Sequence, residues 1–197
     1  SDEADSTYTN KQLSLFNDFY EELAGCGINV PMLCIANSAA IMDYPKTHFD
    51  AVRPGIILYG CYPSEEVDKT RLDLKPVMSV KAYIIHIKTV PAGTSISYGR
   101  RFIADRESKI ATISIGYADG YSRTLTGKAE VLVHGHRVPV VGSICMDQCM
   151  IDVTDVSGVA AGDEVVIMGR SGDDEISAEE IAGKIGTINY EILCDFG

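Results

Sequence analysis

One tyrosine of this sequence lies in a polar turn beside two arginines and could exchange a proton with a ligand. Tyr98 belongs to the run Ser95–Arg101, in which Arg100 and Arg101 follow it closely. Positive charge nearby favours the ionised form of a phenol, whose reference pKa is about 10. A phenolate is a usable proton acceptor. The alternative is a surface tyrosine whose ring packs against its loop, and the residues alone leave both interpretations open.

A second group of residues has the chemistry of an anion site. Asn37 and Ser38 follow one apolar run, and Arg53–Ile56 stands at the start of the next. Backbone N–H groups at a helix start attract an anion, serine adds a hydroxyl donor, and glycine permits close backbone approach. The loops after the last strands of a (β/α) barrel often hold phosphate in this way. The alternatives are an ordinary Asn-Ser helix cap and a Pro-Gly turn.

Two further segments place polar or aromatic side chains beside apolar strands. Gly116–Tyr121 closes a β run with two tyrosines around a tight turn, which amphipathic packing would also explain. Cys145–Met150 puts Asp147 inside a predicted apolar strand, and a buried carboxylate requires partners. Asp147 is therefore either a structural anchor or part of a site. Cys145 and Cys149 would share one strand face, but no second ligand pair accompanies them, so we expect no metal site.

The elements that must position the first of these groups follow a parallel α/β pattern. Thr9–Gln12 matches a capping box, and apolar side chains at helical spacing predict a helix from Lys11 to Ala24. The nearly all-apolar runs Val30–Ala36 and Gly55–Gly60 predict buried strands, with a short helix capped by Asn37 between them. The order helix, strand, helix, strand is typical of α/β proteins.

From about residue 76 onward the sequence is typical of a mostly antiparallel β domain, because short strands alternate with turn signals. We therefore divide the chain into domains 1–75 and 76–197, of the class α/β plus mainly β. One helix is predicted after the capping box Ser177–Glu180 and ends at Gly186. The predicted strands are Val77–Val90, Lys109–Ile115, Ala129–Val133, Arg137–Val141, Cys145–Val153 and Glu164–Met168.

The composition of the chain disfavours nucleic acid and membranes as binding partners. The net charge of -11 and pI of about 4.7 oppose binding to nucleic acid or to an anionic membrane. No run approaches the roughly 18 consecutive apolar residues that span a bilayer. The six cysteines are dispersed without the rhythm of a disulfide framework, which favours free thiols in a reducing cytoplasm. A small-molecule site fits this composition.

Six motifs occur in order along the chain: Ala36–Ala39, Arg53–Ile56, Ser97–Gly99, Ile115–Gly120, Ile144–Gln148 and Thr187–Tyr190. Together they resemble the alanine racemase family over essentially the whole chain. That family holds pyridoxal 5'-phosphate (PLP) in an N-terminal (β/α)8 barrel followed by a mostly β domain, so residues 1–75 would be the last units of the barrel. The resemblance implies interconversion of L- and D-alanine by two-base proton transfer on the PLP-bound substrate, supplying D-alanine for peptidoglycan.

The resemblance also implies which residues meet the substrate. Tyr98 matches the catalytic tyrosine, which faces one side of the substrate Cα while the PLP-binding lysine faces the other. The tyrosine comes from the second subunit, so a head-to-tail homodimer with two composite sites is implied. Tyr117, Met146 and Asp147 match positions that line the substrate site or its entrance.

For the cofactor, the resemblance implies a phosphate site and a contact to the pyridine ring. Ser38, the backbone of Gly55 and Ile56, and Tyr190 would hold the phosphate. Arg53 would hydrogen-bond the pyridine nitrogen and keep it unprotonated, which makes the ring a weaker electron sink. Less delocalisation of the carbanion favours prompt reprotonation over side reactions.

Two departures from the family pattern have consequences. Cys34 stands where the family commonly has a histidine that supports the pyridine-contacting arginine. The PLP-binding lysine belongs to a barrel segment that is absent, and none of the lysines among residues 1–75 stands in its motif. Both ends look truncated, and we expect this chain alone not to racemise alanine. PLP-dependent turnover by the purified chain would contradict that expectation.

Two other functions are compatible with these residues. One is a racemase that acts on serine or on several amino acids, although Asp147 in its Met-Asp-Gln block favours alanine. The other is a noncatalytic PLP-binding or interaction module built on the same scaffold. Such a module would need neither Tyr98 nor Arg53, and both motifs are intact.

Overall fold

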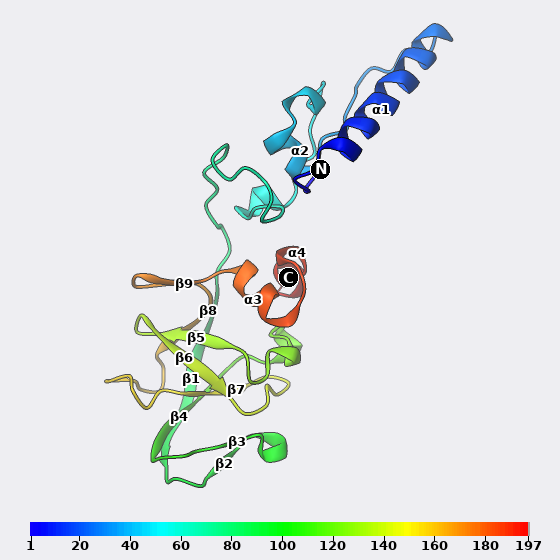
Figure 1. Ribbon diagram of the computed structural model, residues 1–197. Helices are drawn as coiled ribbons and strands as arrows, with labels where there is room; N and C mark the ends of the chain where they lie inside the picture. Colours follow the sequence, from blue (N-terminus) through cyan, green and yellow to red (C-terminus); the bar gives the residue numbers. More distant parts are fainter. Residues whose placement is uncertain (197) are drawn as a thin grey trace. The chain divides into compact units, whose positions relative to one another are not determined.

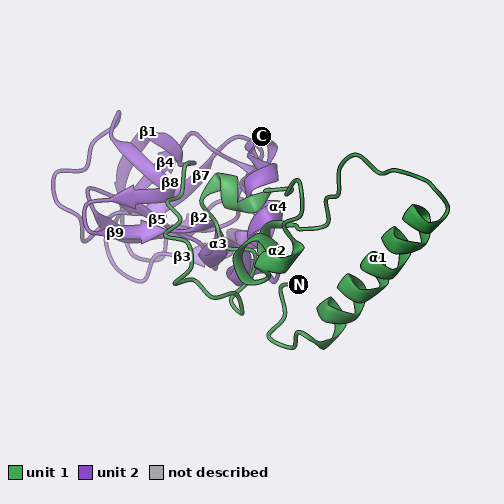
Figure 2. Ribbon diagram, turned by 90° about the horizontal axis from the view of Figure 1, so that it is seen from above, with its two compact units in different colours: residues 1–77 green, residues 78–197 purple. Residues whose placement is uncertain are grey.

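A computed structural model describes residues 1–196 and divides the chain into two units, Ser1–Val77 and Met78–Gly197 (Figure 2). The first unit, unit 1, contains two α-helices and two 3-10 turns. The second, unit 2, contains all the strands of the described chain and two further helices. No helix within residues 1–196 has the length and apolar character needed to cross a membrane.

Both predicted helices of unit 1 are present. Helix α1 spans Thr7–Gly25, four residues earlier at its start than its apolar spacing suggests. The predicted capping box at Thr9 is wrong, because the Asp5 carboxylate accepts from the Thr7 N–H at 2.9 Å and lets the helix begin further upstream. Helix α2 spans Ser38–Asp43, and the Asn37 side chain caps it by accepting from the Ala40 N–H at 3.0 Å.

The first strand predicted in unit 1, Val30–Ala36, is wrong, because this segment joins no β ladder. Backbone hydrogen bonds tie it to the segment after α2, from the Ala51 N–H to the Leu33 carbonyl (3.2 Å) and from the Arg53 N–H to the Ala36 carbonyl (2.9 Å). A parallel strand needs a regular ladder to a neighbouring strand. Residues 1–77 contain no strand that could supply one.

The second predicted strand, Gly55–Gly60, is also wrong and forms the 3-10 turn η2 over Ile56–Tyr59. The Leu58 N–H bonds to the Gly55 carbonyl at 2.9 Å, which closes the turn. Gly60 ends it with φ 76°, a left-handed conformation that suits glycine. A short 3-10 turn, η1, occupies Pro45–Thr47.

Unit 2 is built around a closed antiparallel barrel (Figure 1). Six strands follow the order β1-β4-β7-β6-β5-β8, and β1 also pairs with β8, which removes the exposed sheet edges. The prediction of a mostly antiparallel β domain is confirmed, although its closure has no signal in the sequence. The barrel strands are β1 Val80–Val90, β4 Ser108–Ile113, β5 Glu130–Val133, β6 His136–Val141, β7 Cys149–Asp152 and β8 Glu164–Ser171.

Short strands and helices complete unit 2. Strands β2 (Ser95–Ile96) and β3 (Phe102–Ile103) form a hairpin, and β9 (Asp174–Ile176) pairs with β8. Helix α3 spans Ala178–Ile185 and α4 spans Asn189–Asp195. The predicted cap of α3 is confirmed, because the Ser177 hydroxyl accepts from the Glu180 N–H at 3.1 Å.

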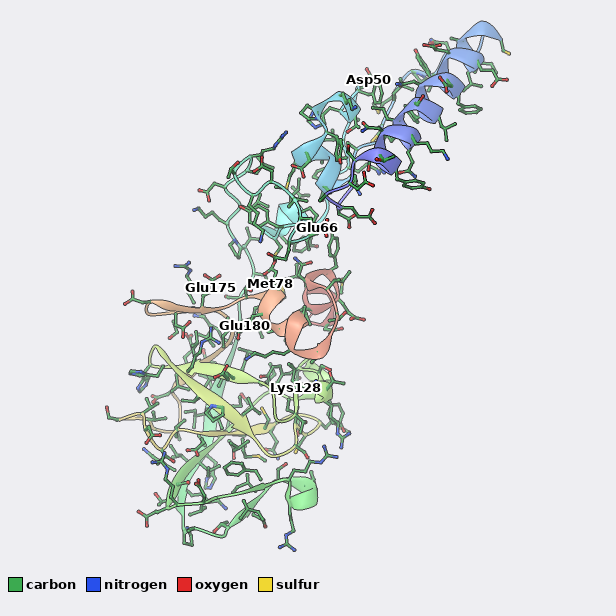
Figure 3. The ribbon with its side chains drawn as sticks, in the orientation of Figure 1. Asp50, Glu66, Met78, Lys128, Glu175 and Glu180 are labelled. Atoms are coloured by element: carbon green, nitrogen blue, oxygen red, sulfur yellow. The ribbon has the colours of Figure 1, made fainter. Side chains whose placement is uncertain are left out.

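An ion-pair network joins β6, β9 and α3. Arg137 contacts the carboxylates of Asp174 at 2.9 Å and Glu180 at 2.7 Å, and it donates to the Glu175 carbonyl at 2.6 Å. Figure 3 shows Glu175 on β9 and Glu180 on α3. The hydrogen bond from Arg137 lowers the pKa of the Glu180 carboxyl, and a second one lowers the pKa of Asp174. Glu180 therefore does not reach back to the helix start, as a capping box would require.

These lowered pKa values give the stability of the chain a defined pH dependence. A carboxyl whose pKa is lower in the folded state stabilises fully above its unfolded pKa, about 4.3 for Glu, and stops doing so as the pH falls through its folded pKa. We expect Arg137→Gln to lower the midpoint temperature of thermal unfolding at neutral pH. The further decrease of this midpoint as the pH falls should be smaller than in the parent chain, measured by circular dichroism. Arg170→Gln is the control, because Arg170 pairs with Glu175 at the surface with 76% of its side chain exposed. If the unfolding midpoint fell by the same amount between neutral and acidic pH in the Arg137 variant and in the parent chain, this prediction would be contradicted.

Candidate active site

Tyr98 stands on the hairpin formed by β2 and β3, which lies beside β4 at one end of the barrel (Figure 1). It begins a 3-10 turn over Tyr98–Arg100, and its side chain is 78% exposed. Within residues 1–196 its hydroxyl has no hydrogen-bond partner. Arg100 and Arg101 are both exposed, and neither donates a hydrogen bond to that hydroxyl in the described chain. The phenol is therefore free to meet a ligand.

A loop of residues 142–148, between β6 and β7, joins Tyr98 to a second turn. The Ser143 hydroxyl donates to the Tyr98 carbonyl at 3.0 Å. Two residues further on, the Cys145 carbonyl accepts from the Tyr117 N–H at 3.0 Å, and the next carbonyl, that of Met146, accepts from the N–H of the residue after Tyr117 at 2.8 Å. One loop, which contains Met146, thus anchors the backbone of both the Tyr98 turn and the Tyr117 turn.

The two tyrosines of the Gly116–Tyr121 turn have different surroundings. Tyr117 begins the 3-10 turn η4 (Tyr117–Asp119) and is 42% exposed. Tyr121 is 1% exposed, and burial raises the pKa of its phenol well above the usual value. Tyr121 therefore packs in the core, whereas Tyr117 and Met146, which is 59% exposed, can face a ligand.

The expectation that Asp147 lies inside an apolar strand is wrong. Strand β7 begins only at Cys149, and Asp147 is exposed on the preceding loop. The loop turns back on itself, because the Cys145 N–H donates to the Gln148 carbonyl at 3.0 Å. Burial raises the pKa of the Cys149 thiol to about 12. Over the described residues no group of His, Cys, Asp and Glu side chains could hold a metal ion.

In unit 1, Ser38 and Gly55 form the centre of the predicted anion site. The Ser38 hydroxyl, 5% exposed, accepts from the Gly55 N–H at 2.9 Å. That contact uses a lone pair of the hydroxyl, so its hydrogen can be donated to a further acceptor. Gly55 is exposed, and the chain enters the η2 turn directly after it at the buried Ile56.

Arg53 is held by backbone carbonyls. Its guanidinium donates to the Cys34 carbonyl at 3.1 Å and to the Ile35 carbonyl at 3.4 Å. The Cys34 sulfur lies 3.4 Å from Arg53 Nη1, the nitrogen that donates to the Cys34 carbonyl, and sulfur is a weak acceptor. The main chain at Cys34 and Ile35 therefore orients the arginine. Arg53 and Asn37 line an open cavity of about 600 Å³ together with apolar side chains of α1.

The remaining predicted phosphate ligand, Tyr190, lies in unit 2. It stands in the first turn of α4 and is 38% exposed. Within unit 1 the structure brings Ser38 and Gly55 together, and within unit 2 it ties the Tyr98 and Tyr117 turns to one loop that contains Met146. Ser143, whose hydroxyl holds the Tyr98 carbonyl, was not predicted from the sequence. Its signal there is the Gly-Ser pair that follows the apolar run of β6.

A helical segment in which Ser38 and Gly55 are hydrogen-bonded, followed by a closed β barrel that exposes a tyrosine, is found in a known class of proteins. The family model for the alanine racemase N-terminal domain matches residues 1–63, and the model for the alanine racemase C-terminal domain matches residues 77–197. The chain belongs to the alanine racemase family. Its predicted fold class is confirmed, because part of the family's N-terminal domain precedes the mostly β C-terminal domain.

Among individual relatives, alanine racemase 1 of Clostridium acetobutylicum is 56% identical over 194 residues, which cover 98% of this chain and 50% of that protein. The alanine racemase of Clostridium difficile 630 in complex with cycloserine has a similar structure, with a TM-score of 0.94, 43% identity and coverage of 100% of this chain and 51% of that one. For the alanine racemase of Bartonella henselae with covalently bound pyridoxal phosphate, the TM-score is 0.86 and the identity 35%, over 100% of this chain and 52% of that one. The chain spans about half the length of these relatives.

Proposed function

We propose that this chain supplies the tyrosine half of an alanine racemase site, in which Tyr98 holds or releases the α-proton of alanine. The observation that carries the proposal is an exposed phenol whose backbone is anchored to the loop that also anchors Tyr117 and Met146. A free phenol on a fixed backbone is the arrangement that general acid–base catalysis requires.

The donors of unit 1 fit PLP. Ser38 retains a hydroxyl hydrogen for a phosphate oxygen, the exposed Gly55 allows close approach to its own backbone and that of Ile56, and Arg53 presents a cation beside a cavity. The relative from Bartonella henselae is described with covalently bound pyridoxal phosphate. When bound, PLP supplies an electron sink for the substrate that has lost its α-proton. Tyr190 is proposed as a further ligand of the phosphate.

The rest of the site comes from a second subunit and from the exposed loop. Tyr117, Met146 and Asp147 line the approach to the substrate. Tyr98 serves the site of a partner subunit in a head-to-tail homodimer, where a lysine on the opposite face of the substrate exchanges the other proton. The product is D-alanine for peptidoglycan, made in the cytoplasm.

The test uses a completed protein, in which this chain follows the amino-terminal half of the Clostridium acetobutylicum relative. We expect the completed protein to interconvert L- and D-alanine with added PLP. L-Serine in place of L-alanine tests the broader specificity, and comparable turnover of serine would contradict the assignment to alanine. A properly folded completed protein that binds PLP but does not turn over alanine would contradict the proposed function.

Ser38→Ala tests the phosphate site in the completed protein. The substitution removes a hydroxyl donor, and one hydrogen bond to a charged group contributes about 1.5–3 kcal/mol, so we expect PLP affinity to fall roughly tenfold or more. Absorbance titration with PLP measures this without relying on turnover. Ser14→Ala, on the exposed face of α1, is the control. Unchanged PLP affinity in the Ser38 variant would remove Ser38 from the site.

A further inference from the structure

We infer that Ser143 and Ser97 are positioning residues that fix Tyr98 for proton transfer. The inference rests on the proposed function of Tyr98 and adds two side chains through which that tyrosine is held. The two serines form a reciprocal pair across the site. The Ser97 hydroxyl donates to the Ser143 carbonyl at 2.8 Å, and the Ser143 hydroxyl donates to the Tyr98 carbonyl at 3.0 Å.

The backbone at Ser97 adopts a conformation that needs external support. Ser97 has φ 66° and ψ 176°, a region that is essentially restricted to glycine. Gly142, at φ 72°, packs directly against it, and a Cβ on Gly142 would lie 2.5 Å from the Ser97 Cβ. Strained residues of this kind persist where the surrounding structure holds them and are concentrated at functional sites. The hydrogen bonds of the serine pair and the close approach of Gly142 supply that support.

Packing alone does not fix the Tyr98 turn. The Tyr98 side chain is 78% exposed, so few contacts hold its ring. An open pocket of about 200 Å³ is lined by Ser97 and by side chains of β1, β2, β4 and β7. Ile96 and Phe102 hold the hairpin strands by packing on the apolar core, whereas the exposed Tyr98 turn depends on polar contacts to keep its position. The serine pair provides these contacts on both sides of the peptide group that joins Ser97 to Tyr98.

The loop that holds Tyr98 also makes contacts to the core and to the Tyr117 turn. Ser143 is 3% exposed, and the next N–H along the chain donates to the Thr126 hydroxyl at 3.2 Å, which anchors the loop to the core. Two residues after Ser143, the loop begins to accept the hydrogen bonds of the Tyr117 turn. The loop that contains Ser143 therefore fixes the position of the Tyr98 turn relative to the Tyr117 turn.

The test compares three variants, Ser143→Ala, Ser97→Gly and the control Ser95→Ala. Ser95 is exposed on the same hairpin, and its hydroxyl makes no hydrogen bond within the described residues. Ser97→Gly removes the hydroxyl and at the same time relieves the strained backbone, so it should fold at least as well as Ser143→Ala. In the 197-residue chain, we expect hydrogen exchange of residues 96–104 to be faster in Ser143→Ala and Ser97→Gly and unchanged in Ser95→Ala.

In the completed protein, we expect Ser143→Ala and Ser97→Gly to lower kcat about tenfold or more, because small displacements of a reacting group are costly. KM should change less than about twofold, since the substrate contacts remain. Because Tyr98 serves one face of the substrate, the α-deuterium isotope effect should increase for one enantiomer of alanine only. A purely structural defect would reduce the active fraction and leave both isotope effects unchanged.

Two contrary results are distinguishable. If both serine variants match Ser95→Ala in hydrogen exchange, kcat and isotope effects while Tyr98→Phe is inactive, the positioning role is wrong and the proposed function stands. If Tyr98→Phe retains full activity, the proposed function itself is wrong. The positioning role is then wrong as well, because it depends on proton transfer by Tyr98.

Discussion

Tyr98→Phe in the completed protein is expected to lower kcat by about 10²–10⁴-fold, the usual contribution of a general acid or base. The change removes one hydroxyl, which has no hydrogen-bond partner in residues 1–196, from a side chain that is 78% exposed. The folded state therefore loses no hydrogen bond within the described residues. We expect the unfolding midpoint and the affinity for PLP to stay at the values of the unmodified protein, so that the loss appears in kcat alone.

The matched control for this variant is Tyr83→Phe. Tyr83 lies on β1 of the same unit and is 56% exposed, so the two changes remove the same group from similarly accessible surfaces. We expect Tyr83→Phe to racemise alanine at the parent rate. If both tyrosine variants kept the parent rate, Tyr98 would be an ordinary surface residue.

Gly116→Ala is expected to damage both the stability and the activity of the completed protein. A Cβ at this position would lie 2.4 Å from the carbonyl oxygens of Cys145 and Met146, which are backbone atoms and cannot rotate away. Forced overpacking of this kind costs about 1–3 kcal/mol of unfolding free energy. The displaced loop also carries the hydrogen bonds to the Tyr117 and Tyr98 turns, so kcat should fall beyond the loss of stability.

Gly183→Ala controls for the general effect of adding a methyl group to unit 2. Gly183 lies inside α3, and a Cβ there would meet nothing within 4 Å. Alanine is favoured over glycine in a helix by up to about 1 kcal/mol, so this variant should be slightly more stable and equally active. Denaturant titration and initial rates measure both properties. A Gly116 variant that unfolds and turns over like the Gly183 variant would show that the loop has room to move.

The strands of unit 2 were predictable because their partners lie within the chain. Short apolar runs and turn signals located all six barrel strands, whereas the pairing of β1 with β8 joins residues 81 to 88 positions apart and leaves no local pattern. The prediction of α3 succeeded because Ser177 and Gly186 mark its ends by side-chain and backbone chemistry. Helix α4 was missed, since no side chain caps its start.

In unit 1 the two apolar runs were predicted to be strands, and neither run forms one. Periodicity reports burial, but a strand also needs a hydrogen-bonded neighbour, and no strand is present within residues 1–77 to pair with Val30–Ala36. The run after Gly55 became a 3-10 turn because two glycines bound only four residues. The sequence placed Ser38 and Gly55 in one candidate anion site, and the 2.9 Å hydrogen bond shows that the two residues are neighbours, while the anion site itself stays a prediction.

Tyr98 shows where local sequence is insufficient. Its exposure in a polar turn was predictable, but its chemistry was indicated only by the ordered motifs of the family. The Ser97–Ser143 pair was not predictable, because it joins residues 46 positions apart. Asp147 was misplaced for a related reason, since carbonyls of its loop are taken by the Tyr117 turn and β7 cannot extend back to include it.

Subunit mixing tests most directly whether this chain supplies its tyrosine to the site of a partner. The completed protein carrying Tyr98→Phe is mixed, unfolded and refolded together with a completed protein whose PLP-binding lysine is replaced. If Tyr98 serves the partner's site, each mixed dimer regains one complete site, and an equimolar mixture should recover about a quarter of the parent activity. If tyrosine and lysine come from the same subunit, every site in every dimer lacks one of them. Activity no higher than that of either variant alone would contradict the shared site.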